Sequence, residues 1–247
     1  MKLFRPDMVF FDYGGTLIDE GHYCAADGLQ ALLDCTEHPA ELDCQALLSL
    51  WREDASIIDR RTHPDQIDLE IPLQPMLRCV LARAGCTTAL SPVELEMVFH
   101  RANAVHTAMA DAADGLSMLR EKAIRTSVVS NITLSGEALR QAIADCLPAH
   151  SFEFVITSAD YVFCKPCPLL FEVALRTARV DPARCWFVGN SFSADICGAA
   201  SVGLYPILLD PDAPEAIRSD ALSDSCGGTP FCRVSSWKAL NSLISAL

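Results

Sequence analysis

MVFFDYGGT, residues 8–16, is the stretch that decides the fold of this chain of 247 residues. Its first four residues form an unbroken apolar run, which stops at the carboxylate of Asp12 and is followed by two glycines. Short apolar runs bounded by turn residues are typical of strands buried on both faces, as in a parallel sheet covered by helices. The stretch therefore predicts a buried parallel strand with a polar turn at its carboxyl end.

Further runs of the same kind favour an α/β fold with a doubly wound, Rossmann-like parallel sheet. Helix-like stretches separate the later runs, as they do in such sheets. Two runs lead into polar clusters, Ser130-Asn131 and Gly189-Asn190 with Asp195 beyond. The carboxyl ends of parallel strands line the crevice that binds ligands, so these clusters are expected to meet Asp12 there. The runs are Ser127–Val129, Phe154–Ile156, Trp186–Val188 and Tyr205–Leu209.

The segment after the first strand has a different pattern. Leu42–Ile58 and Leu73–Ala84 have helical periodicity, and no convincing strand alternation occurs between residues 19 and 109. Ser91-Pro92-Val93-Glu94 has the form of a capping box at a helix start. We therefore expect a core of residues 1–18 and 110–247, and an inserted all-α cap of residues 19–109. Asp220–Thr229 is expected to be a surface loop before a final strand and helix.

Composition restricts the partners. The formal net charge of −13 leaves no basic stripe for a nucleic acid backbone. The apolar run before Asp12 is far too short for a membrane span or a signal-peptide core. The twelve cysteines are scattered through apolar stretches without an export signal, so we expect most of them to be reduced and structural. These features indicate a cytoplasmic protein that acts on a small molecule, and they leave the oligomeric state open.

Four motifs in order carry a family resemblance. They are the stretch around Asp12, Val-Val-Ser130-Asn131, Lys165-Pro166, and Val-Gly189-Asn190-Ser-Phe-Ser-Ala-Asp195. Together they resemble the motifs of the haloacid dehalogenase superfamily over nearly the whole chain. The helical insertion resembles the α-helical cap of that family.

The resemblance implies a hydrolase of the phosphatase class, which transfers the phosphoryl group of a small phosphorylated metabolite through an aspartyl-phosphate intermediate. Its catalytic residues would be Asp12, Ser130 and Lys165. Its phosphate-binding residues would be Gly15, Ser130, Asn131 and Lys165, with Gly15 and Asn131 donating backbone amides. Its magnesium ligands would be Asp12, the carbonyl of Gly14, Asn190, and Asp195 directly or through water.

Elementary chemistry supports the same reading. Phosphoryl transfer needs an in-line nucleophile and positive groups around the equatorial oxygens. A carboxylate nucleophile such as Asp12 repels a phosphate dianion unless a hard cation lies between them, and oxygen ligands suit magnesium. Lys165 and Ser130 are expected to face a solvated crevice, so replacing either should change stability little.

The pattern breaks at Gly14, where phosphatases of this family usually carry the aspartate that protonates the leaving group. Its loss should slow turnover, because positioned acid–base catalysis contributes about 10²- to 10⁴-fold. The role could have moved to Glu20 or His22, the nearest titratable residues. Otherwise the chain is an impaired family member that binds a phosphorylated ligand. If the missing aspartate at Gly14 is what limits turnover, Gly14→Asp should raise phosphatase turnover by up to about 10²-fold.

Enzymes of the family that catalyse two other reactions also lack that aspartate. Phosphonoacetaldehyde hydrolases need a cap lysine, and residues 19–109 contain none. Haloacid dehalogenases carry a tyrosine at the position of Gly14 and a more closely spaced fourth motif, so a dehalogenase remains an alternative.

Two further clusters carry weaker hypotheses. Arg60, Arg61 and His63 form the compact basic cluster of the expected cap and could meet an acidic leaving group. Cys164-Lys165-Pro166-Cys167 has redox spacing, and with Cys226 and Cys232 it could instead form a zinc site.

Overall fold

The computed structural model describes residues 4–59, 69–213, 218–221 and 228–247. Within these residues a seven-stranded sheet has the order β5-β4-β1-β6-β7-β9-β8. All neighbours pair in parallel except β8, which runs antiparallel to β9. This confirms the doubly wound α/β class. The strands are β1 (Met8–Phe11), β4 (Arg125–Ser130), β5 (Val155–Thr157), β6 (Cys185–Gly189), β7 (Tyr205–Leu209), β8 (Arg218–Ala221) and β9 (Pro230–Val234).

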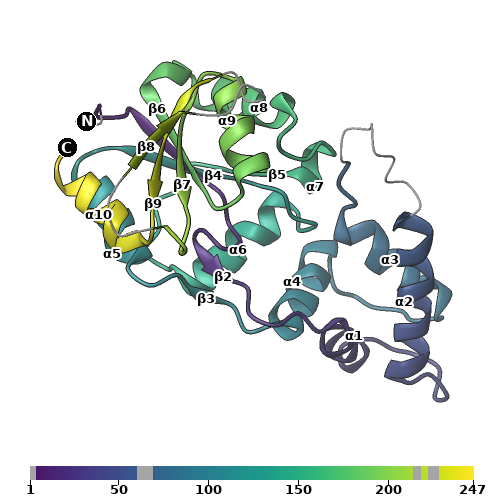
Figure 1. The fold of residues 1–247 in the computed structure, drawn as a ribbon. Helices are drawn as coiled ribbons and strands as arrows, with labels where there is room; N and C mark the ends of the chain where they lie inside the picture. The colour runs from purple at the N-terminus through teal and green to yellow at the C-terminus, as the bar shows by residue number, and fades with distance from the viewer. Residues whose placement is uncertain (1–3, 60–68, 214–217, 222–227) are drawn as a thin grey trace.

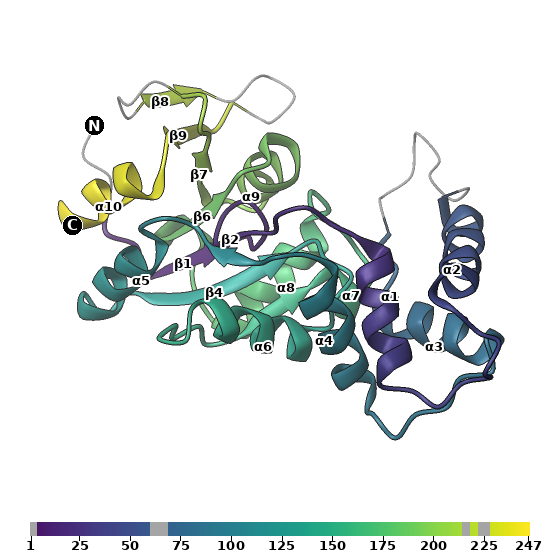
Figure 2. The same cartoon turned by 90° about the horizontal axis from the view of Figure 1, so that it is seen from below.

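Helices cover both faces of this sheet (Figure 2). Alternate residues of β1 divide between two hydrophobic clusters, because successive strand side chains point to opposite faces. Val9 and Phe11 pack with α5 (Ala112–Glu121), α6 (Gly136–Cys146) and α10 (Trp237–Ser245). Met8 and Phe10 pack with α8 (Pro168–Ala178) and α9 (Gly198–Ser201). Burial on both faces explains why these strands are uniformly apolar rather than alternating.

Four helices between β2 and β3 lie to one side of the sheet (Figure 1). β2 (Ile18–Asp19) pairs antiparallel with β3 (Thr107–Ala108), so the chain leaves and re-enters the sheet layer through one short ribbon. The absence of strands expected for residues 19–109 was wrong at Thr107–Ala108, which is too short to show alternation. The helices are α1 (Ala25–Asp34), α2 (Cys44–Asp59), α3 (Leu73–Arg83) and α4 (Pro92–Asn103).

The predicted start of α4 is confirmed. Ser91 Oγ accepts from the Glu94 amide at 3.3 Å, and Glu94 Oε2 accepts from the Ser91 amide at 2.7 Å. The loop expected at Asp220–Thr229 is wrong at its first two residues, because β8 extends to Ala221 and pairs with β9. Arg60, Arg61, His63 and Cys226 lie outside the described residues.

None of the described helices combines the length and the apolar character needed to cross a bilayer.

Candidate active site

Three strand ends meet at the centre of the sheet. Asp12 follows β1, Ser130 ends β4, and Asn190 follows β6. β1 lies between β4 and β6, with Phe11 opposite both Val128 and Val188. The Asp12 amide donates to the Val188 carbonyl at 2.9 Å, which extends the ladder by one residue and fixes the carboxylate at the edge of the sheet. The predicted meeting of these residues is confirmed.

Lys165 lies at the centre of this cluster. Its Nζ donates to Asp12 Oδ1 at 2.7 Å, to Asp195 Oδ1 at 2.6 Å and to the Val129 carbonyl at 3.0 Å. An ammonium has three hydrogens, so these partners satisfy all of them. Ser130 Oγ also donates to Asp12 Oδ1, at 3.0 Å. The sequence therefore brings Asp12, Ser130 and Lys165 into one hydrogen-bonded group.

The group is buried, contrary to the expectation of a solvated crevice for Lys165 and Ser130. Lys165 is 3% exposed, Ser130 2% and Asp195 1%, while Asp12 is 8% exposed. Burial alone would lower the pKa of Lys165, but the adjacent Asp12 and Asp195 carboxylates raise it. Burial raises the pKa of Asp195, and the Lys165 ammonium opposes that change. Lys165 therefore stays charged between two carboxylates, and its burial removes the reason for expecting its loss to change stability little.

The Lys165 loop is held by Asn131. Asn131 Nδ2 donates to the Lys165 carbonyl at 2.9 Å, and Asn131 Oδ1 accepts from the Lys165 amide at 2.7 Å. The side chain thus fixes the loop that carries the ammonium. The helix after this loop, α8, begins at Pro168.

The role predicted for Gly15, an amide donor to phosphate, stays a prediction. In the structure its amide donates to the Ile18 carbonyl at 2.8 Å. Gly15 also makes room for Asn190. Its φ is +69°, and a Cβ at this position would lie 2.3 Å from Asn190 Nδ2.

The residues proposed as metal ligands offer oxygen atoms. Asn190 is exposed, and its Oδ1 accepts weakly from Thr16 Oγ1 at 3.5 Å. Asp195 is already engaged through both oxygens, with Lys165 and with the Ser191 amide at 2.9 Å. The described residues contain no group of three or more His, Cys, Asp or Glu side chains that could hold a metal. A hard cation would therefore rely on Asp12, the Gly14 carbonyl and Asn190, and this oxygen set suits magnesium.

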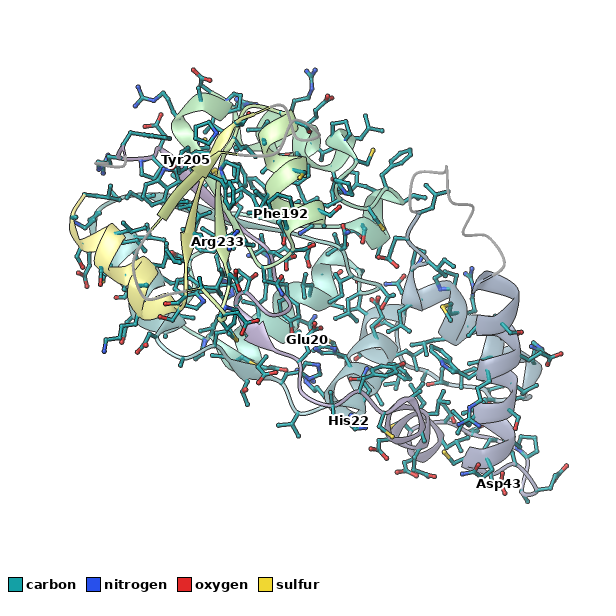
Figure 3. The ribbon with its side chains drawn as sticks, viewed as in Figure 1. Glu20, His22, Asp43, Phe192, Tyr205 and Arg233 are labelled. Carbon is teal, nitrogen blue, oxygen red and sulfur yellow. The ribbon has the colours of Figure 1, made fainter. Side chains whose placement is uncertain are left out.

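A cavity of about 600 Å³ adjoins this group on the side of the four helices. Glu20 and Asn131 line it from the sheet side, while Trp51, Phe99 and His100 line it from the helices. His22 is exposed and does not line the cavity. Figure 3 shows Glu20 between the sheet and the helices, with His22 further along the chain towards α1. Burial raises the pKa of Glu20, and the negative charge of Asp12 adds to this shift.

Two histidine rings pack against each other in the same cavity. The rings of His100 and His106 have centroids 3.9 Å apart, and His100 is 6% exposed. Burial lowers the pKa of His100 to about 3, with the charge of His106 acting in the same direction and that of Asp145 opposing it. The ring is therefore neutral in the folded chain at neutral pH.

This neutral ring predicts acid sensitivity. An unfolded histidine titrates near its ordinary pKa of about 6.5, so the unfolded chain gains a proton first and stability is lost as the pH falls below that value. Between about pH 7.5 and pH 5.5, His100 should cost about 1 kcal/mol of unfolding free energy. Urea unfolding of His100→Asn should show a correspondingly smaller loss. Exposed His22→Asn is the control; equal pH slopes for His100→Asn and the wild type would contradict the prediction.

The Cys164-Cys167 pair does not favour redox chemistry. Cys164 Sγ donates to Glu70 Oε2 at 3.7 Å, and Cys167 is buried. A neighbouring carboxylate disfavours the thiolate that exchange requires. Cys232, the candidate zinc ligand, is buried on β9.

Comparison with known proteins identifies the architecture. A family model described as haloacid dehalogenase-like hydrolase matches residues 6–203. Glyceraldehyde 3-phosphate phosphatase of Methanothermobacter thermautotrophicus is 38% identical over 103 residues, which cover 40% of this chain and 43% of that protein. Haloacid dehalogenase-like hydrolase domain-containing protein 3 of Homo sapiens is 31% identical over 112 residues, which cover 45% and 43%. The chain thus spans less than half the length of these relatives.

Solved structures share the fold over nearly the full length. A 2-haloacid dehalogenase from Pseudomonas syringae has a TM-score of 0.60 at 23% identity, covering 96% of this chain and 97% of that chain. A phosphatase from Thermococcus onnurineus has a TM-score of 0.57 at 19% identity, covering 97% and 98%. At this identity the likeness concerns the fold alone.

Proposed function

Because the chain belongs to the haloacid dehalogenase-like hydrolase family, we propose that it is a magnesium-dependent phosphohydrolase that uses Asp12 as its nucleophile. The observation that carries the proposal is the Lys165 ammonium, which lies 2.7 Å from Asp12 Oδ1 and 2.6 Å from Asp195 Oδ1. The phosphatase names of several relatives support this class over others in the family. The substrate we propose is a small phosphorylated metabolite.

The nucleophile is oriented before substrate arrives. Ser130 and Lys165 both donate to Oδ1 of Asp12, so they hold this oxygen and leave Oδ2 for attack or for a metal. In the reaction, Asp12 attacks phosphorus, the bond to the leaving oxygen breaks, and an aspartyl-phosphate forms. We expect Ser130 and Lys165 then to redirect their hydrogen bonds from Asp12 to the transferred oxygens.

The charge of the site requires a cation. Asp12 and Asp195 carry two negative charges against the single positive charge of Lys165, which leaves a net charge of −1 before phosphate enters. We propose that magnesium is held by Asp12, the Gly14 carbonyl and Asn190, and that Asp195 acts indirectly by holding Lys165. When bound, the ion neutralises the phosphate and offsets its repulsion from Asp12.

The proposal predicts metal-dependent phosphate release. A screen of phosphate esters with magnesium should find at least one substrate. Chelation with EDTA should lower its turnover by about 10²-fold or more, because the single charge of Lys165 does not offset two carboxylates and a phosphate. Restored magnesium should restore turnover. The same protein is assayed for chloride release from 2-chloropropionate without metal. Chloride release in place of phosphate release would contradict the proposal and establish the dehalogenase alternative.

A further inference from the structure

The space left by Gly14 is filled by another carboxylate. A Cβ at Gly14 would lie 2.1 Å from Oε2 and 2.9 Å from Cδ of Glu20. The φ of Gly14 is not positive, so the backbone alone does not require glycine here. The space is occupied by the carboxyl group of Glu20, the end of an exposed side chain that a larger residue at position 14 would have to displace. Glycine at position 14 and glutamate at position 20 therefore belong to one arrangement.

The chain holds Glu20 in place from both sides. Asp19 before it ends β2, which pairs with β3. Gly21 after it has a φ of +57° and donates its amide to Asp19 Oδ1 at 3.1 Å. A Cβ on Gly21 would lie 2.6 Å from the Val105 carbonyl, so the turn packs against the returning chain. Glu20 therefore stands on a defined turn at the crossing between sheet and helices.

Two other carboxylates near the cavity, those of Glu70 and Glu96, already accept hydrogen bonds. Glu70 Oε2 accepts from Ser158 Oγ at 2.7 Å, and Glu70 Oε1 accepts from the Ile71 amide at 3.0 Å. The buried Glu96 accepts from Gln74 and from Ser135. His22, the other sequence candidate, does not line the cavity. Glu20 lines the cavity and reaches the Asp12 turn.

We propose that Glu20 is the proton-transfer residue of this site, placed in the space that Gly14 leaves open. The inference rests on the proposed phosphatase function. In the first step Asp12 attacks phosphorus, the bond to the leaving oxygen breaks, and the Glu20 carboxyl gives its proton to that oxygen. In the second step the Glu20 carboxylate takes a proton from water, the water oxygen attacks phosphorus, and the bond to Asp12 breaks. Glu20 is protonated again, and the products are an alcohol and inorganic phosphate.

The position of Glu20 changes the effect expected for the substitution Gly14→Asp. From sequence alone, Gly14→Asp adds a missing group and raises turnover. In the structure its side chain overlaps Glu20, so the single variant displaces one carboxylate with another and little gain is expected. The informative variant is the exchange Gly14→Asp/Glu20→Ala, which moves the carboxyl group back to position 14.

The test compares leaving groups. For glycerol 3-phosphate, whose alkoxide needs a proton, Glu20→Gln should lower kcat by about 10²- to 10⁴-fold. For p-nitrophenyl phosphate, which departs unaided, the same variant should release a burst of one nitrophenol per site and then turn over slowly, because only the water step needs the base. His22→Gln is the control and should behave as the wild type. The exchange variant should turn over glycerol 3-phosphate about 10²-fold faster than Glu20→Gln does.

The outcomes separate this inference from the function it rests on. If Glu20→Gln has the wild-type kcat on both esters while Asp12→Asn has no activity, the role of Glu20 is overturned and the proposed phosphatase function is retained. An equal loss on both esters with no burst also overturns it, because a structural defect does not distinguish leaving groups. Phosphate release from none of the proteins, the exchange variant included, overturns the proposed function itself.

Discussion

Replacing Asp12 with asparagine is expected to lower phosphate release by about 10⁴-fold or more, the largest loss of activity predicted for any single substitution in this chain. An amide oxygen is a poor nucleophile, and Asp195, the other carboxylate of the group, is 1% exposed with both oxygens already hydrogen-bonded. Ser130 and Lys165 contact Asp12 directly and would remain, so they could still bind phosphate. The measurement is phosphate release with magnesium, alongside binding of the same ester by calorimetry.

The folded structure should survive this change. Asparagine has nearly the same shape as aspartate, and Lys165 keeps Asp195 as a charged partner at 2.6 Å. We therefore expect a melting temperature within a few degrees of the wild type. Retained ester binding with lost turnover would identify Asp12 as the nucleophile. Turnover close to wild type would show that the attacking group lies elsewhere.

The fold could be predicted because its signals are local. Met8–Phe11 and Tyr205–Leu209 are apolar throughout, and the structure gives strands with these bounds. The capping box at Ser91 specifies a helix start from four consecutive residues. Meeting of the strand ends follows from parallel topology alone. The short β3 strand could not be predicted, because two residues show no period.

The site could be predicted only in part, because its energetics depend on contacts distant in sequence. The motifs identified Asp12 and Lys165, but their burial depends on packing between β1 and a loop 153 residues away. The use of the Gly15 amide by Ile18 depends on turn geometry. The overlap at Gly14 is a matter of space, and Glu20 six residues later gives no sequence signal that it fills that space.

Because Lys165 is buried between two carboxylates, its loss should lower stability strongly. Lys165→Met keeps much of the side-chain volume and removes the charge, so Asp12 and Asp195 lose the cation between them. Breaking a buried ion pair by removing one partner costs about 3–5 kcal/mol of unfolding free energy, because a buried charge is left without a partner. Urea unfolding should show this loss. Asp195 is 1% exposed, so solvent cannot replace the ammonium.

The double variant Lys165→Met/Asp195→Asn separates charge from packing. It leaves Asp12, at the rim of the group, as the one carboxylate, so it should be more stable than Lys165→Met alone. The single variant should also depend on pH in a specific direction. Without Lys165, burial raises the pKa of Asp195 above its unfolded value, so stability is present at low pH and lost as the pH rises. The difference in unfolding free energy between the wild type and Lys165→Met should therefore narrow as the pH falls. A gap independent of pH, with no rescue by Asp195→Asn, would mean that Lys165 contributes through packing and that its charge is not what holds the two carboxylates together.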